Sequence, residues 1–421
     1  MALLPSRPTD SFAGTPGGAA AGIHSIGIVG AGTMGAGIAQ AAAQAGFTVR
    51  LYDVEDRFLD RGRNTIEDSL TRFVERGRLP AEARDAALGR LSFSTDLGLF
   101  RDCDLVVEAV PEQLDLKREI FSKVDAIVGP AAVLASNTSS LSVTDLAAGT
   151  GRPDRFVGLH FFNPPVLMKL VEVVRAETTS PETVALTQDL ARRMGKVPVT
   201  CKDTPGFIVN RVARPFYLQG MQAFGEGLGS VDEVDAVARG LGFPMGPFQL
   251  MDLIGLDVNL SVTRSVWEQR FMEPRLRPHP VQEGLVRAGC FGRKSGTGFY
   301  SYGADPATPA VHRDPGAPRL SGPHFDWTRW HPHVGAPAHA QIAARLLSSL
   351  VNEAYFALGE GVASASDIDT GVKLGTNYPR GLVEWGDALG LDLVLETLDV
   401  LEAWYRDGRY AAAPLLRQQA S

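Results

Sequence analysis

A glycine-rich turn between a buried strand and a helix limits the folds open to this chain more than any other feature. The stretch SIGIVGAGTMGAGIAQAAAQAGFTVRLYDVE contains Gly30, Gly32 and Gly35 in the spacing G-x-G-x-x-G. Apolar residues at 25 to 29 predict a strand before the turn, and the alanine-rich segment 34 to 45 predicts a helix after it. The spacing alone also fits a tight structural turn, but this context is typical of a dinucleotide-binding βαβ unit.

The residues around the turn predict a site for NAD. The first glycine permits the turn, the second lets the backbone approach a pyrophosphate, and the third allows close packing of helix on strand. Thr33 and Met34 lie where the turn meets the helix, whose N-terminus would face the anion. The next strand ends at Asp53, which can accept hydrogen bonds from a ribose 2′-hydroxyl and repel a 2′-phosphate. We therefore expect NAD rather than NADP, and FAD is disfavoured because no further flavin-type motif follows.

Strand and helix patterns alternate from residue 23 to residue 203. Short apolar runs predict strands at 25–30, 48–53, 90–95, 104–110, 132–137 and 156–162. Helical patterns lie between them at 34–45, 56–90 and 112–128. This alternation predicts a doubly wound, mostly parallel α/β sheet of Rossmann type. From Thr204 onward strand signals nearly vanish, which predicts an all-α domain over 204–302.

The helical region is present twice in the chain. Residues 211–257 reappear as 345–392, with the tripeptides Gly-Glu-Gly at 225–227 and 359–361 and Gly-Leu-Asp at 255–257 and 390–392. We expect a second, degenerate copy over 338–415, and a linker rich in Pro, Gly and His over 303–337. Asn210 falls opposite Ala344, so the second copy has lost a polar residue. The two copies could pack across a pseudo-twofold axis, as two subunits of a symmetric dimer do, and a homodimer of whole chains is a further expectation.

Composition favours a protein that acts on small molecules. The 421 residues carry a formal net charge of -7, which argues against a nucleic-acid partner, and no apolar stretch is long enough to cross a membrane. Three scattered cysteines indicate a reducing compartment, and we expect a cytoplasmic protein. Residues 1–22 are expected to be a disordered tail. No metal site is expected, because the histidines in and after the linker have no spacing that one helix face would bring together.

Polar residues follow three of the predicted strands. Glu112 and Lys117 lie in VVEAVPEQLDLK, Ser139 lies in ASNTSSL, and His160 lies in GLHFFNPPVLMKLVEV. Strand ends of a doubly wound sheet meet at the cofactor crevice, so these residues are functional candidates. Each also has a simpler explanation: Ser139 could cap the next helix, Glu112 and Lys117 could lie on an exposed helix face, and His160 could be a packed core histidine.

His160 and Glu172 together favour a dehydrogenase. Removal of hydride from an alcohol carbon needs a base for the hydroxyl proton, and a metal-free site most often uses histidine. Such a histidine needs a carboxylate on its other ring nitrogen to fix the tautomer and to stabilise the imidazolium. Glu172 lies in the apolar run MKLVEVV, where an unpaired carboxylate would be costly to bury. We therefore expect His160 and Glu172 to form a catalytic pair.

Six motifs in order resemble the L-3-hydroxyacyl-CoA dehydrogenase family, including its 3-hydroxybutyryl-CoA members. They are GIVGAGTMGAGIAQ, NTSSL, GLHFFNPPVLMKLVEVV, CKDTPGFIVNR, GFPMGPFQLMDLIGLD and GRKSGTGFYSY. The long two-copy layout is similar to that of bacterial members associated with fatty-acid, polyhydroxybutyrate and phenylacetate breakdown. The match covers about 23 to 302, and the repeat extends it to about 405.

The resemblance implies a role for each motif residue and an acyl-CoA substrate. His160 would be the base and Glu172 its orienting partner. Ser139 and Asn210 would bind the 3-oxygen and the thioester region of the substrate. The resemblance also places a group of residues near NAD: Asp53, Glu112, Lys117 and Asn163. A helix-terminal asparagine that makes a local bond is the simpler explanation of Asn210.

Two other functions remain open at this stage. An enzyme with the same architecture could act on a free hydroxy acid such as gulonate. A protein descended from the family could instead bind NAD as a non-catalytic structural protein. The sequence does not indicate the acyl chain length, or whether the acyl group ends in a second carboxylate, as in 3-hydroxyadipyl-CoA.

Overall fold

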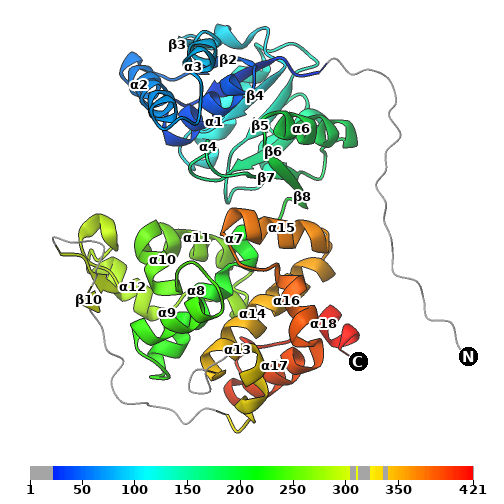
Figure 1. The fold of residues 1–421 in the computed structure, drawn as a ribbon. Coiled ribbons are helices and arrows are strands. Elements are labelled where there is room, and N and C mark those ends of the chain that lie inside the picture. Colours follow the sequence, from blue (N-terminus) through cyan, green and yellow to red (C-terminus); the bar gives the residue numbers. More distant parts are fainter. Residues whose placement is uncertain (1–21, 304–309, 312–322, 335–339, 421) are drawn as a thin grey trace, which may run out of the picture.

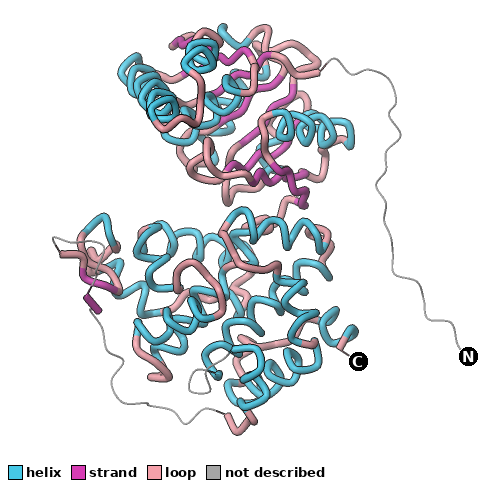
Figure 2. The backbone as a smooth tube through the Cα atoms, viewed as in Figure 1, coloured by secondary structure: helices cyan, strands magenta, loops and turns pink. Residues whose placement is uncertain are grey.

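The computed structural model describes residues 22–303, 310–311, 323–334 and 340–420. Figures 1 and 2 show a sheet with helices on both of its faces, followed by a separate layer of helices. Strand β8 leads directly from the sheet into the helical part (Figure 1). The predicted fold class, a doubly wound sheet followed by helices in two copies, is therefore confirmed. No helix in the described residues is long and apolar enough to cross a membrane.

The sheet has eight strands in the order β3-β2-β1-β4-β5-β6-β7-β8. Their bounds are β1 Ser25–Val29, β2 Thr48–Tyr52, β3 Leu91–Ser94, β4 Leu105–Glu108, β5 Val133–Ser136, β6 Phe156–Phe161, β7 Leu170–Arg175 and β8 Val197–Lys202. The first six strands are parallel to one another, whereas β7 runs antiparallel to β6 and β8 runs parallel to β7. This reversal brings the β6 and β7 side chains into direct cross-strand register.

Helices cover both faces of the sheet because its strands are apolar on both sides. Leu105 and Val107 pack in one hydrophobic cluster with α1 and α6, whereas Val106, between them, packs in another with α4 and α5. The bounds are α1 Thr33–Gln44, α2 Asp56–Glu75, α3 Ala81–Leu88, α4 Leu114–Asp125, α5 Val143–Ala147 and α6 Pro181–Arg193, with 3-10 turns η1 Leu97–Phe100 and η2 Pro153–Arg155. The helical pattern predicted over 56–90 is two helices, because Gly77 adopts a positive φ after α2 and Pro80 precedes α3 with an extended backbone.

Two sets of helices that correspond in sequence follow the sheet. The first contains α7 Val209–Val212, α8 Arg214–Gly225, α9 Val231–Gly240, α10 Pro247–Ile254, α11 Leu256–Gln269 and α12 Pro280–Arg287, with turns η3 Pro274–Leu276 and η4 Arg293–Ser295 and the short strand β9 Tyr300–Ser301. The second contains α14 Ala340–Gly359, α15 Ala365–Gly375, α16 Leu382–Leu389, α17 Leu391–Tyr405 and α18 Pro414–Gln419. Strand β10 Ala310–Val311 pairs with β9.

Equivalent residues of the two copies make the same local contacts and adopt the same backbone conformations. Asp235 accepts hydrogen bonds from the first backbone N–H groups of α10, and Asp369 does the same for α16. Gly255 and Gly390, which follow these two helices, have φ angles of 100° and 84°. Because L-residues with a side chain rarely adopt these angles, glycine is required at both positions. The duplication predicted from the sequence is therefore a duplication of structure.

Reciprocal ion pairs join the two copies. Arg211 of the first copy contacts Glu360 of the second at 2.6 Å, and Arg345 of the second contacts Glu226 of the first at 2.6 Å. The alignment that pairs the two Gly-Glu-Gly motifs also pairs these arginines with each other and these glutamates with each other. Such an exchange of equivalent contacts is the pattern of a twofold interface between identical subunits.

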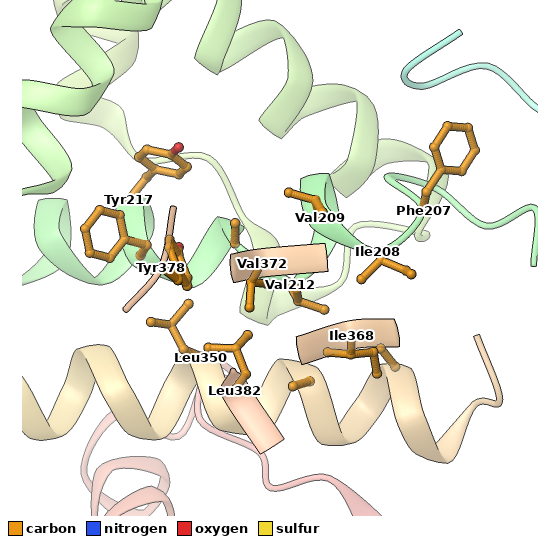
Figure 3. Close-up of a cluster of buried hydrophobic side chains, with 14 of the residues drawn as sticks. Phe207, Ile208, Val209, Val212, Tyr217, Leu350, Ile368, Val372, Tyr378 and Leu382 are labelled. Atoms are coloured by element: carbon orange, nitrogen blue, oxygen red, sulfur yellow. The ribbon is translucent and has the colours of Figure 1, made fainter. Parts of the chain in front are cut away.

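The apolar core between the copies is continuous (Figure 3). Val209 and Val212 of α7 lie opposite Ile368 and Val372 of α15, and Leu350 of α14 lies close by. These side chains are almost fully buried, so each contributes on the order of 1.5–3 kcal/mol of hydrophobic stabilisation. The second copy therefore covers an apolar surface of the first that would otherwise face water.

Two predicted boundaries differ from the structure. Within the expected linker, residues 327–334 form η5 Trp327–Trp330 and α13 His331–Val334. Trp330 is fully buried and donates to Thr397 at 3.1 Å, so one aromatic side chain anchors a segment too short to show periodicity. The second copy continues past residue 415, because α18 ends at Gln419 and its Leu416 is buried. The predicted tail, apart from Gly22, and most of the linker lie outside the described residues.

Candidate active site

The glycine-rich turn has the geometry that a dinucleotide needs. Gly30 has a φ of 99°, and a Cβ added to Gly35 would lie 1.7 Å from the carbonyl oxygen of Gly30. A Cβ on Gly32 would meet nothing within 4 Å, so this glycine borders open space. Helix α1 has no side-chain cap and no acidic residue in its first turn, where Thr33 and Met34 lie. Its first N–H groups are therefore available to an anion such as a pyrophosphate.

Asp53 lies at the end of β2, beside the glycine-rich turn. Its carboxylate accepts hydrogen bonds from the backbone N–H groups of Ala31 and Val54, both at 2.7 Å. These bonds hold the carboxylate against the turn and leave acceptor capacity on both oxygens. The residues present therefore fit the adenosine ribose of NAD.

We expect Asp53→Asn to weaken the preference for NAD over NADP. The amide keeps the size and one acceptor, but it loses the negative charge that repels a 2′-phosphate. Hydrogen bonds to charged groups are worth about 1.5–3 kcal/mol, so the ratio of kcat/KM values for NAD and NADP should fall by about tenfold or more. Glu55→Gln, which changes a nearby exposed carboxylate, is the control and should leave the ratio unchanged. An unaltered ratio in Asp53→Asn would contradict the role of this charge.

Three charged residues form a cluster at the end of β4, and two of them, Glu108 and Lys117, are buried. The Lys117 ammonium lies 2.6 Å from Glu108 and 3.2 Å from Glu112, and the side chain is 1% exposed. Lys117 is therefore not on an exposed helix face, which excludes the simpler explanation. It can influence a bound cofactor through Glu112 rather than by direct contact, because its side chain has almost no free surface. Glu108 also accepts a hydrogen bond from Ser136 at 2.6 Å.

Glu112 holds the loop after β5. One of its oxygens accepts from the Thr138 hydroxyl at 2.5 Å and from the backbone N–H groups of Ser139 and Ser140 at 2.9 and 3.1 Å. Burial disfavours the charged form of Glu112, but Lys117 and these hydrogen bonds outweigh burial, so the pKa of Glu112 lies below its ordinary value. An ionised Glu112 therefore fixes the backbone position of Ser139.

Ser139 and Asn210 come together from the two parts of the molecule. The Asn210 amide, at the start of α7, donates to the backbone oxygen of Ser139 at 3.4 Å. The next helix after Ser139 is capped by Ser142 and not by Ser139, so the capping explanation of Ser139 is wrong. Ser139 and Asn210 are only partly buried, which leaves their polar atoms within reach of a ligand.

His160 and Glu172 form the predicted pair. They are direct cross-strand partners in the antiparallel β6 and β7 ladder, and Nδ1 of His160 lies 2.6 Å from Oε2 of Glu172. The other carboxylate oxygen accepts from the backbone N–H groups of Ile208 and Val209 at 3.1 and 2.9 Å. Glu172 is fully buried, and His160 is 7% exposed. Because a carboxylate only accepts, Nδ1 carries the hydrogen and Nε2 of His160 remains as an acceptor.

A cavity of about 280 Å³ opens beside the end of β6. Asn163 lies on its wall, three residues after His160, with Met168, Phe243, Leu253 and Tyr378 among the other lining residues. Tyr378 belongs to the second copy, so both copies build this cavity. Asn163 is exposed and therefore accessible to a ligand in the crevice. Among the described residues, no group of three or more His, Cys, Asp or Glu side chains could hold a metal ion.

Two further polar residues of the site, Glu108 and Ser136, were not predicted from the sequence. Glu108 is the one charged residue of the buried strand β4, and Ser136 ends the neighbouring buried strand β5. The signal that identified Glu172, an acidic residue in an apolar strand, was also present at Glu108. Its partner Lys117 could not be recognised as buried from sequence, because lysine is normally exposed.

Comparison with known proteins agrees with this geometry. Residues 25–204 match the family model of the 3-hydroxyacyl-CoA dehydrogenase NAD binding domain. Residues 206–302 and 342–421 both match the model of the 3-hydroxyacyl-CoA dehydrogenase C-terminal domain. The chain belongs to the 3-hydroxyacyl-CoA dehydrogenase family. The double match shows that both helical copies are related to the same domain.

Similar proteins of this 3-hydroxyacyl-CoA dehydrogenase family include one that matches nearly the whole chain. The chain is 38% identical to a 3-hydroxyadipyl-CoA dehydrogenase of Escherichia coli, over 94% of this chain and 98% of that protein. It is 46% identical to a probable 3-hydroxybutyryl-CoA dehydrogenase of Deinococcus radiodurans, over 66% of this chain and 99% of that one. A solved 3-hydroxybutyryl-CoA dehydrogenase of Escherichia coli K12 has a TM-score of 0.85 at 36% identity, with 94% and 98% of the two chains covered.

The family assignment confirms the cofactor and the enzyme class. The chain is an NAD-dependent oxidoreductase of the 3-hydroxyacyl-CoA dehydrogenase type. The comparisons agree with the resemblance that the six sequence motifs predicted.

Proposed function

We propose that His160, Glu172, Ser139 and Asn210 carry out the reversible oxidation of an (S)-3-hydroxyacyl-CoA to the 3-oxoacyl-CoA. The observation that carries this proposal is the 2.6 Å contact between His160 and a fully buried Glu172. A carboxylate is costly to bury, and this one has the three hydrogen-bond donors needed to keep it in place. Its position suits a group that balances the positive charge on a histidine.

Each of these residues has a defined role in the proposed mechanism. His160 takes the hydroxyl proton of the substrate on Nε2, and Glu172 offsets the charge that the imidazole gains. Ser139 and Asn210 hold the substrate oxygen as it becomes a carbonyl. NAD, when bound, supplies the acceptor for the hydride that leaves the same carbon. Glu112 and Asp53 line the cofactor side of the crevice, Asn163 lies where this side meets the cavity beside β6, and Lys117 keeps Glu112 in position.

We propose that the second helical copy takes the place of a dimer partner. The reciprocal pairs of Arg211 with Glu360 and of Arg345 with Glu226 support this role. Ala344, which corresponds to Asn210, is fully buried and has no polar side chain. The chain then has one active site, and the second copy stabilises the first. Association of two whole chains into a homodimer remains a prediction, and a measurement of the molecular mass in solution tests it.

A substrate comparison tests the proposed reaction. NADH formation should be observed with (S)-3-hydroxybutyryl-CoA and should be absent, or at least 100-fold slower, with gulonate and with free 3-hydroxybutyrate. A preference for a free hydroxy acid would support the alternative enzyme. Binding of NAD without turnover of any of these compounds would support the non-catalytic alternative.

A further inference from the structure

Arg214 differs from the other buried arginines of the chain. Four arginines are at most 9% exposed among the described residues: Arg211, Arg214, Arg275 and Arg345. Arg211 and Arg275 contact Glu353, and Arg345 contacts Glu226. No carboxylate of the described residues lies within 4 Å of the Arg214 guanidinium, whose one hydrogen-bond partner there is the Thr263 hydroxyl at 3.3 Å. Its Nε atom is buried without a partner.

The isolated charge of Arg214 is energetically unfavourable as it stands. Burial lowers the pKa of the Arg214 guanidinium, which means that its surroundings disfavour the charged form. A buried charge is normally paired, because removing it from water without a partner costs several kcal/mol. The structure therefore lacks a counter-ion for Arg214, and an anionic ligand would provide one.

Two tyrosines link Arg214 to the cavity beside the active site. The Arg214 guanidinium lies 4.8 Å from the ring centre of Tyr217, and Tyr217 and Tyr378 both line the cavity. Figure 3 shows these tyrosines close together, one from each helical copy. The Tyr378 hydroxyl is buried without a hydrogen-bond partner. Two tyrosines thus line a cavity that is otherwise mostly apolar, and Arg214 lies behind this lining, against the ring of Tyr217.

The cavity is placed to receive the far end of an acyl group. Asn163, on its wall, follows the strand that carries His160, and Phe162 stacks 4.6 Å from the His160 ring. Phe243 and Leu250 also line the cavity and suit methylene groups. A substrate whose C3 atom lies at His160 could extend its acyl chain from the crevice into this space.

We propose that Arg214, Tyr217 and Tyr378 select an acyl group that ends in a carboxylate, as the adipyl group does. This inference rests on the proposed function and adds the substrate class. The apolar wall would contact the methylene groups, the tyrosine hydroxyls would donate to the terminal carboxylate, and Arg214 would supply the opposite charge. An acyl group that ends in a methyl would leave Arg214 without a counter-ion and the Tyr378 hydroxyl without a hydrogen-bond partner.

Two substrates of equal chain length test the proposal. (S)-3-hydroxyadipyl-CoA and (S)-3-hydroxyhexanoyl-CoA differ only in the terminal carboxylate. The wild-type kcat/KM should be at least tenfold higher for the adipyl substrate. Arg214→Met and Tyr217→Phe should each lower kcat/KM for the adipyl substrate by about ten- to a hundredfold, mainly through KM, because a charged hydrogen bond is lost. Both variants should keep their activity with the hexanoyl substrate within about threefold.

The control is Tyr355→Phe, which removes a hydroxyl from α14 at a position that does not line the cavity. This variant should leave kcat/KM unchanged for both substrates. The melting temperature of each variant separates a folding defect from a change in selectivity, and Tyr217→Phe is the milder substitution if Arg214→Met does not fold. Equal wild-type rates with the two substrates, or equal losses with both in the variants, would overturn the carboxylate subsite and leave the proposed function intact. Failure of the wild type with both substrates would instead refute the proposed function.

Discussion

Replacement of His160 by glutamine should lower kcat by roughly 10² to 10⁴, because a general base contributes about that factor to a proton transfer. Glutamine approximates the size of the imidazole and can still hydrogen-bond Glu172, but it cannot accept a proton at neutral pH. The affinity for NADH should stay unchanged, since we propose that His160 contacts the substrate and not the cofactor. Steady-state NADH formation and a fluorescence titration with NADH measure the two quantities.

The control for His160→Gln is His324→Gln, at an exposed position. It should retain wild-type turnover and NADH affinity. If His160→Gln retained more than a third of the wild-type kcat, His160 would not be the base. A large loss of NADH affinity in that variant would mean that His160 acts mainly in cofactor binding.

The second large effect concerns stability. Glu226→Gln should lower the free energy of unfolding by about 3–5 kcal/mol, because it leaves the fully buried Arg345 without its carboxylate partner. Among the described residues, Glu226 is the carboxylate that contacts Arg345, although the Tyr405 hydroxyl also bonds to the guanidinium. Guanidinium chloride denaturation followed by far-UV circular dichroism measures the change.

The reciprocal pair provides a matched control. Glu360→Gln should lower the free energy of unfolding much less than Glu226→Gln does, because Glu360 is partly exposed and Arg211 keeps its 2.7 Å contact with Glu353. The double variant Glu226→Gln with Arg345→Met should recover much of the lost stability, since it also removes the unpaired buried charge. If Glu226→Gln were as stable as Glu360→Gln, or the double variant no better than the single one, the ion pair would not stabilise the contact between the copies.

Much of the fold follows from local patterns in the sequence. Alternating apolar runs and helical patterns predicted the doubly wound sheet, and the recurrence of Gly-Glu-Gly predicted the second helical copy. The contact between His160 and Glu172 could also be predicted, because an acidic residue in an apolar strand needs a partner. Residues 327–334 could not be predicted to be structured, since a single buried Trp330 leaves no periodic signal.

The cofactor and the contact between His160 and Glu172 were determined by the sequence itself, because they depend on short spacings and on the register of neighbouring strands. Gly30, Gly32 and Gly35 shape one turn, and His160 and Glu172 lie on consecutive strands of one ladder. Such short-range geometry follows from the backbone conformation of the element.

Tertiary structure alone decided the burial of Lys117, the exchange of ion pairs between the copies and the isolation of Arg214. Arg211 and Glu360 are 149 residues apart in the chain, and Arg345 and Glu226 are 119 apart. Whether a buried arginine finds a carboxylate depends on how distant helices pack, which no local pattern encodes. For that reason the enzyme class could be predicted from the sequence, whereas the groups that we propose to select the acyl end became visible only in the folded chain.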